Sequence, residues 1–148
     1  MTLSALIFPI GDDHYAVAAD TVREVVSEPR PTRLPTVPAV VLGAFNLRGE
    51  VVPMFDAGAL LGVGPLVEGP FAIVVTTAMG PAGIVVAGLP RVVDLGEQLG
   101  PSDLRGTLGI YGIEGGVAVL VDVEALLLPY SNLDASAVTA AAEGRAAR

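Results

Sequence analysis

The chain of 148 residues contains no cysteine, no lysine and one histidine. Without cysteine, neither a disulfide framework nor a thiolate metal site can form. Without lysine, the chain has no Walker-type phosphate loop, whose motif ends in Gly-Lys-Ser/Thr. His14 follows two aspartates at a predicted turn, and no second histidine exists to complete a metal site or a catalytic dyad. We therefore expect no catalytic residues, no metal and no cofactor.

The charge balance limits the classes of partner. The formal net charge is −8, and all eight basic residues are arginine. Nucleic-acid binding usually requires a basic stripe, so we expect no nucleic-acid partner. No stretch approaches the roughly 20 apolar residues that span a bilayer, and residues 1–15 lack the basic start of a signal peptide. The sequence predicts a cytoplasmic protein without direct membrane insertion.

The chain contains an internal repeat. Residues 41–61 and 107–127 align at a constant shift of 66, and a shift of 67 superposes residues 2–26 on 69–93. Self-similarity at a fixed period marks repeated structural units. The identical pairs in the first alignment are Leu42/Leu108, Gly43/Gly109, Gly49/Gly115, Val51/Val117, Asp56/Asp122, Ala59/Ala125, Leu60/Leu126 and Leu61/Leu127.

Strand signals dominate both copies. Short apolar segments recur with turn signals every 8–12 residues, which is typical of small all-β barrels. We predict strands near 3–10, 14–19, 22–27, 43–47, 50–55, 71–77, 83–87, 90–95, 107–113 and 117–121. The predicted domains are one five-stranded barrel in residues 1–68 and another in 69–128, packed on each other. Residues 129–148 are predicted to form a C-terminal helix or a flexible tail.

A charged hairpin tip distinguishes the two copies. Arg48 in the first copy corresponds to Glu114 in the second, whereas the tip glycines Gly49 and Gly115 are retained. A glycine there can adopt the positive φ of a tight hairpin. Because the hairpin tolerates either charge, Arg48 is not needed to form it. This favours a recognition role for Arg48 and for Asn46, which lies one strand alternation earlier.

Two aspartates occupy equivalent positions in the repeat. Asp56 and Asp122 each precede a short helical segment, where a carboxylate can accept hydrogen bonds from free amide groups. A pair of catalytic carboxylates is the alternative reading. Helix capping explains both residues without catalysis, and we predict that role.

The segment from Thr21 to Asp56 resembles the CheW family of chemotaxis coupling proteins. The resemblance lies in Val22-x-Glu24-Val25, Leu34-Pro35 with Pro38, Gly43-x-x-Asn46-Leu47-Arg48-Gly49 and Val52-Pro53-x-x-Asp56. It implies two five-stranded, SH3-like β-barrels and a non-catalytic adaptor. The adaptor would link the cytoplasmic tips of chemoreceptors to the regulatory domain of a CheA-type histidine kinase. The receptor-binding positions would lie in the groove between the barrels and are Val22, Glu24, Gly43, Asn46 and Arg48.

Two other readings stay open at this level. The chain could be a CheW-like interaction module of a pathway that controls pili or gene expression, because partner choice lies in surface details. A small-ligand-binding or enzymatic barrel would need a polar pocket with perturbed titratable groups. The scarcity of histidine, cysteine and lysine argues against a small-ligand-binding or enzymatic barrel.

Overall fold

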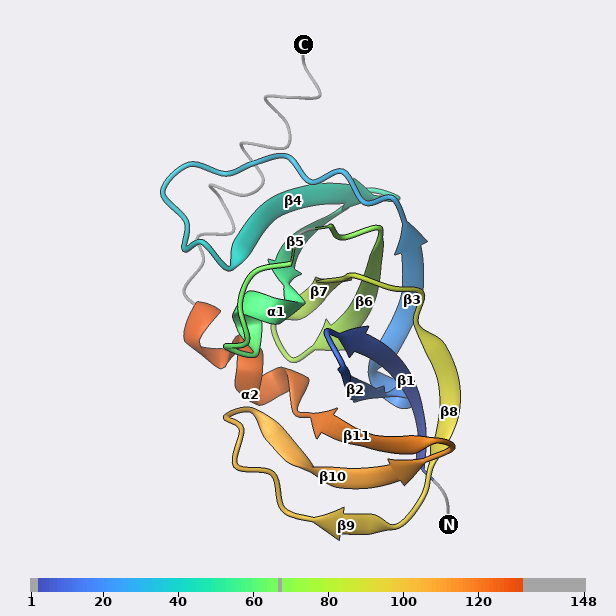
Figure 1. Cartoon of the computed structure of the whole chain (residues 1–148). Coiled ribbons are helices and arrows are strands. Elements are labelled where there is room, and N and C mark those ends of the chain that lie inside the picture. Colours follow the sequence, from blue (N-terminus) through green and yellow to red (C-terminus); the bar gives the residue numbers. More distant parts are fainter. Residues whose placement is uncertain (1–2, 67, 132–148) are drawn as a thin grey trace.

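The structure, a computed structural model, describes residues 3–66 and 68–131 and is built mainly of β-strands (Figure 1). The prediction of an all-β fold with short helices is confirmed. The strands are β1 (Leu3–Ile10), β2 (Asp13–Ala18), β3 (Val22–Ser27), β4 (Val41–Leu47), β5 (Glu50–Asp56), β6 (Phe71–Thr77), β7 (Gly80–Val86), β8 (Arg91–Leu95), β9 (Gln98–Gly100), β10 (Thr107–Ile113) and β11 (Gly116–Val121). The helices are α1 (Ala57–Leu60), α2 (Val123–Leu127) and the 3₁₀ turns η1 (Ala19–Thr21) and η2 (Leu128–Tyr130).

The strands form two sheets that exchange hairpins between the halves of the chain. The six-stranded sheet has the order β8-β1-β2-β11-β10-β9, and the five-stranded sheet has the order β3-β6-β7-β5-β4. The predicted division into a barrel of residues 1–68 and a barrel of residues 69–128 is therefore wrong. The 3₁₀ turn η1 follows β2 directly, and the next strand, β3, belongs to the other sheet. The six-stranded sheet thus combines the β1–β2 hairpin of the first half with the strands β8 to β11 of the second half. The five-stranded sheet combines the β6–β7 hairpin of the second half with the strands β3 to β5 of the first half.

The exchange preserves the repeat that the sequence shows. The repeat pairs β1 with β6, β2 with β7, β3 with β8, β4 with β10 and β5 with β11. Under this pairing, the order β8-β1-β2-β11-β10 becomes β3-β6-β7-β5-β4, which is the order of the other sheet. The registers agree as well, since Val25 pairs with Ile73 where Val92 pairs with Leu6. Both pairs of equivalents, Val25/Val92 and Leu6/Ile73, differ by 67 positions.

Each sheet is closed by the segment that follows its outer strand. In the six-stranded sheet, Gly112 accepts a hydrogen bond from the Gly96 amide (2.8 Å) and donates one to the Glu97 carbonyl (3.1 Å). In the five-stranded sheet, Thr32 and Ala44 exchange two backbone hydrogen bonds of 2.7 and 2.9 Å. These bonds leave fewer unpaired edge groups. They support the predicted SH3-like form of the barrels, which stays a prediction.

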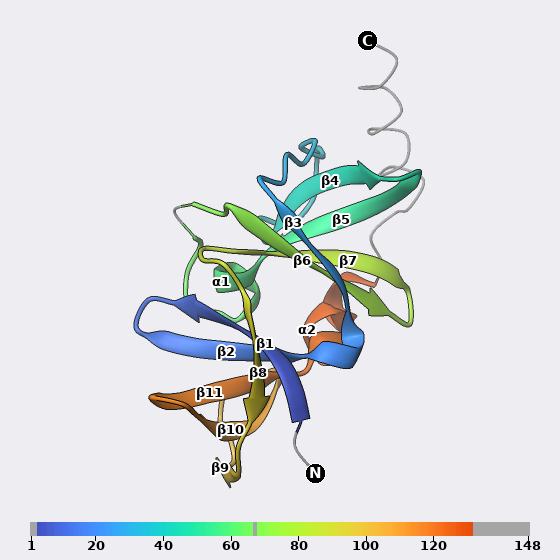
Figure 2. The ribbon, with the colours of Figure 1, turned by 90° about the vertical axis from the view of Figure 1, so that its right-hand side faces the viewer.

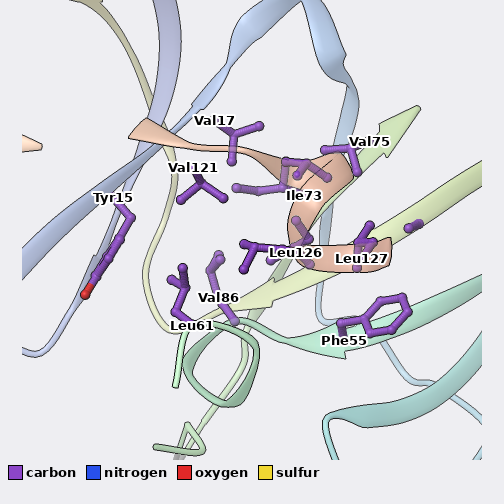
Figure 3. Close-up of a cluster of buried hydrophobic side chains, with 14 of the residues drawn as sticks. Tyr15, Val17, Phe55, Leu61, Ile73, Val75, Val86, Val121, Leu126 and Leu127 are labelled. Atoms are coloured by element: carbon purple, nitrogen blue, oxygen red, sulfur yellow. The ribbon is translucent and has the colours of Figure 1, made fainter. Parts of the chain in front are cut away.

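Alternating side chains of the central strands enter different cores. In β1, Ala5 and Ile7 pack inside the six-stranded sheet, whereas Leu6 and Phe8 face the other sheet. This is the period of two that a strand buried on both faces requires. The core between the sheets is the largest and also receives α2 (Figure 3). Full burial of each large apolar side chain contributes about 1.5–3 kcal/mol, so the two sheets stabilise each other.

Two regions differ from the predictions or lie outside them. The segment 96–106, in which we predicted no strand, contains the short strand β9, which pairs with β10. The predicted C-terminal helix or tail lies outside the described residues, apart from 129–131. Within the described part of the chain, no helix is long and apolar enough to cross a bilayer.

The hairpin exchange makes a test of folding possible. We expect fragments 1–68 and 69–148 to lack stable sheets when separate, because each lacks the hairpin or the strands that complete its sheet. Mixing the fragments should restore the β-sheet circular dichroism signal and a cooperative melting transition. A fragment that melts cooperatively alone would contradict this expectation.

Candidate functional site

The tip of the β4–β5 hairpin adopts a turn with two positive φ angles. Arg48 has φ 50° and Gly49 has φ 92°. This backbone suits the twist of paired strands, but it is unfavourable for a residue with a Cβ atom, such as Arg48. The Asn46 side-chain oxygen accepts a hydrogen bond from the Gly49 amide at 2.8 Å. Asn46 thus holds the turn, a role that the sequence analysis did not assign to it.

Arg48 reaches back from the tip to β3. Its guanidinium donates to both carboxylate oxygens of Glu24, with one contact at 3.2 Å. The exposed fraction is 69% for the Arg48 side chain and 28% for that of Glu24. The structure thus brings together two of the predicted receptor-binding residues, which are 24 positions apart in the chain. Most of the Arg48 side-chain surface stays open to a partner.

A second ion pair lies beside the first. Arg23 donates to Glu50 at 2.6 Å, so both charged residues of β3 contact the β4–β5 hairpin. The sequence analysis missed this pair. The available signal was the charge order, in which Arg23-Glu24 on one strand faces Arg48 and Glu50 on the other. The four charges sum to zero, which makes the site locally neutral.

The two ion pairs shift the acid–base equilibria of their members. The hydrogen bond from Arg48 lowers the pKa of the Glu24 carboxyl below its ordinary value of 4.5, assisted by attraction to Arg48 and Arg23 and opposed by partial desolvation. Arg23 lowers the pKa of Glu50 in the same way. Because the folded pKa values are lowered, the pairs stabilise the fold above pH 4.5. That contribution is lost as the pH falls through the lowered values.

Gly43 has a structural role that differs from the predicted receptor contact. Its φ is 138°, and an added Cβ would lie 2.1 Å from the Thr32 carbonyl oxygen. Thr32 pairs with Ala44, the residue after Gly43, and this pairing closes the sheet. Only glycine fits at position 43, because the segment between β3 and β4, which contains Thr32, passes this close to the β4 backbone.

The predicted capping residues lie at the starts of the two short helices. Asp56 accepts a hydrogen bond from the Ala59 amide at 2.9 Å, and Asp122 accepts one from the Ala125 amide at 3.1 Å. Asp56 is buried and also accepts from the Leu66 amide at 3.1 Å, so it holds the connector that follows α1. Gly115 at the second hairpin tip has φ 84°.

The strands β3 and β8 lie on the same side of the molecule, and each carries exposed apolar residues or is preceded by one. This is the right-hand side of Figure 1, which Figure 2 turns toward the viewer. Val22 is half-buried, and Val25 is 38% exposed. Leu89 and Val92 are 63% and 70% exposed. The sequence analysis named only the β3 residues, although the repeat shift of 67 points to the other two. We call Val22, Glu24, Val25, Arg48, Leu89 and Val92 the receptor surface.

No group of three or more histidine, aspartate or glutamate side chains that could hold a metal ion occurs in residues 3–66 and 68–131. His14 lies in β2, opposite Pro9. No residue of the receptor surface is a nucleophile with an adjacent base, as covalent catalysis requires. The arrangement offers charged donors and acceptors beside apolar side chains, which suits binding of another protein.

Comparison with known proteins agrees with this geometry. The model of the CheW-like domain matches residues 4–128. The chain belongs to the CheW-like domain family. The chemotaxis protein CheW of Klebsiella aerogenes is 32% identical over 133 residues, covering 82% of this chain and 80% of that protein. The "Probable chemotaxis protein CheW" of Rhizobium etli is 42% identical over 60 residues, covering 40% of this chain and 39% of that protein.

A solved structure supports the same fold. The crystal structure of the scaffolding protein TtCheW from Thermoanaerobacter tengcongensis superposes with a TM-score of 0.76. It is 20% identical to this chain, and the superposition covers 86% of this chain and 93% of the TtCheW chain. CheW-like family membership confirms the predictions of a non-catalytic protein and of a chemotaxis-type scaffold or adaptor. The receptor-binding role of the individual residues stays a prediction.

Proposed function

We propose that this CheW-like protein couples the cytoplasmic domain of a chemoreceptor to the regulatory domain of a CheA-type histidine kinase. It would act in the cytoplasm, without catalysis of its own. The observation that carries the proposal is the conformation of Arg48, a mostly exposed arginine with positive φ at a hairpin tip. A strained residue at an exposed position favours a functional explanation.

The β10–β11 hairpin, which is the repeat equivalent of β4–β5, provides a comparison for the turn at Arg48. Glycine or asparagine would form the Arg48 turn with less strain, because both tolerate a positive φ. The equivalent tip residue, Glu114, does not have a positive φ. Arginine is therefore not the residue that the backbone of this tip would select. A binding partner that uses the guanidinium supplies a reason for it.

The apolar part of the receptor surface suits a helix. Receptor tips in this family are helical bundles, and a helix binds apolar surfaces through side chains spaced three and four residues apart. Val22, Val25, Leu89 and Val92 supply such contacts from two strand regions. Arg48 can donate to a carboxylate or to free carbonyls at a helix end through several N–H groups.

A second apolar surface is available for the kinase. Leu99, Leu104 and Leu108 are 59%, 39% and 54% exposed, and they lie in β9, in the connector after it and in β10. Leu42, the repeat equivalent of Leu108, is partly buried, because it packs against the core cluster that includes Val52 and Met54. Exposed apolar side chains grouped in this way often mark protein interfaces. We propose that this surface contacts the kinase regulatory domain.

A bridging assay tests the proposed function. Receptor cytoplasmic fragments from the same genome are immobilised, and the matching histidine kinase is added with or without this protein. We expect the kinase to be retained only when this protein is present. Leu108→Asp should abolish kinase retention while this protein still binds the receptor fragment. Failure of every encoded receptor and kinase to form the three-component complex would refute the proposed function.

A further inference from the structure

A pocket of about 660 Å³ lies between the turn that joins β1 to β2 and the segment that follows α1. Asp12 and Asp13 line it from the turn, and Glu68 lines it from the segment after α1. No arginine or histidine is among the described residues that line this pocket. It shares no residue with the receptor surface, and the leucines proposed to contact the kinase do not line it. We call it the acidic pocket.

A buried tyrosine directs its hydroxyl group into the acidic pocket. Tyr15 is only 2% exposed, and its ring stacks on Phe8 with the ring centroids 6.1 Å apart. Tyr15 lines the pocket, and Figure 3 shows its hydroxyl oxygen directed away from the labelled core side chains. Within residues 3–66 and 68–131, this hydroxyl forms no side-chain hydrogen bond, although no fully buried side-chain oxygen there lacks a partner. The oxygen is therefore accessible from the pocket and open to a ligand.

The surroundings of Tyr15 keep its phenol group neutral. Burial and the negative charge of Asp13 raise the pKa of Tyr15 above its ordinary value of 10.0. A protonated phenol can accept a hydrogen bond from a cation and donate one to a carboxylate. Polar atoms of buried side chains usually have such partners. A cationic ligand in the acidic pocket would supply one for Tyr15.

The lining of the acidic pocket favours an organic cation over a metal ion. In the described part of the chain, no three acidic or histidine side chains are arranged to hold a metal ion. The three carboxylates of the pocket are therefore not grouped around a single small ion. Ile10, Val63 and Leu66 add apolar surface to the same pocket. A methylene chain covers such surface while its charged ends stay near carboxylates and water.

We propose that the acidic pocket binds a linear polyamine, a cation with ammonium groups joined by short methylene chains. Asp12 and Asp13 would accept hydrogen bonds from one ammonium group and Glu68 from another, because these carboxylates lie on two different segments. The Tyr15 hydroxyl would accept a further bond from a ligand N–H group. The methylene chains would cover the apolar lining residues. The net charge of −8 raises the local concentration of such a cation.

Titration of the full-length, ¹⁵N-labelled protein with spermidine tests the site without receptor or kinase. The titration is run at about 0.15 M salt, which screens weak attraction to the rest of the acidic surface. We expect saturable shifts of the Gly11, Gly64 and Ala87 amide signals, with a dissociation constant of about 1 mM or lower. The Gly112 and Gly115 signals, in the β10–β11 hairpin, should not move. Absence of saturable shifts up to about 20 mM spermidine would overturn the proposal. The same saturable shifts with magnesium chloride alone would also overturn it.

Three variants distinguish the acidic pocket from the general negative charge of the protein. Asp13→Asn should weaken spermidine binding about twofold to fivefold, as loss of one exposed ion pair does. Tyr15→Phe keeps the ring that stacks on Phe8 and should weaken binding about twofold to tenfold, because one hydrogen bond is lost. Asp103→Asn removes the same charge from the exposed connector between β9 and β10 and should leave the affinity unchanged. Melting curves verify that all three variants are folded. Equal weakening by Asp13→Asn and Asp103→Asn, or wild-type affinity in both pocket variants, would overturn the proposal.

Discussion

Replacing Arg48 with asparagine should weaken receptor binding on the order of 30-fold or more while changing the stability of the fold by no more than about 1 kcal/mol. Stability changes little because relief of the backbone strain offsets the loss of the exposed ion pair to Glu24. Arginine at the centre of an interface is often a dominant contributor, and loss of about 2 kcal/mol of binding free energy corresponds to this factor. Asparagine tolerates the φ of 50° better than arginine does, so the hairpin should form readily. Titration of a receptor fragment and thermal melting measure the two effects.

Two control variants separate recognition from general charge effects. Arg105→Asn makes the same chemical change at an exposed residue of the connector between β9 and β10, and it should leave receptor affinity within about twofold of wild type. Arg48→Lys keeps the charge but loses the planar fork of donors, so it should restore only part of the affinity. Full receptor affinity in Arg48→Asn would remove this residue from the interface.

Replacing Gly43 with alanine should destabilise the protein by about 2–5 kcal/mol. The φ of 138° is unfavourable for any residue with a Cβ, and that atom would lie 2.1 Å from the Thr32 carbonyl oxygen. The connector would have to move away from β4, which breaks the two Thr32–Ala44 hydrogen bonds. A melting temperature lower by roughly 5–15 °C is expected for a chain of this size.

Glycines of the second copy provide the comparison for Gly43. Gly112→Ala should be nearly neutral, because no atom lies within 4 Å of its added Cβ and its φ is not positive. Gly109→Ala, at the position equivalent to Gly43, should have an intermediate effect, since its Cβ would first meet the flexible Gln98 side chain. Equal melting temperatures for Gly43→Ala and Gly112→Ala would contradict the structural role of Gly43. They would leave the predicted receptor contact as its explanation.

The sequence by itself determined the all-β class, the repeat and the hairpin tips. These features depend on local patterns, because alternating apolar residues and turn glycines act within about ten residues. The repeat also identified the Arg48/Glu114 difference, which favoured a recognition role for Arg48. The resemblance to the CheW family, which comparison confirmed, came from one continuous segment that contains Asn46-Leu47-Arg48-Gly49.

Only the tertiary structure decided which half completes each sheet. The strands β1, β2, β6 and β7 are apolar on both faces, so the sequence pattern permits pairing with either copy. Twin copies make the two alternatives nearly equal in local energy, and long-range packing between the sheets selects one. The same long-range geometry brought Arg23 to Glu50 and Glu24 to Arg48, and it placed Gly43 against Thr32. Contacts between residues far apart in the chain have no fixed spacing, so the charge order of Arg23-Glu24 and of Arg48 and Glu50 did not by itself predict the two ion pairs.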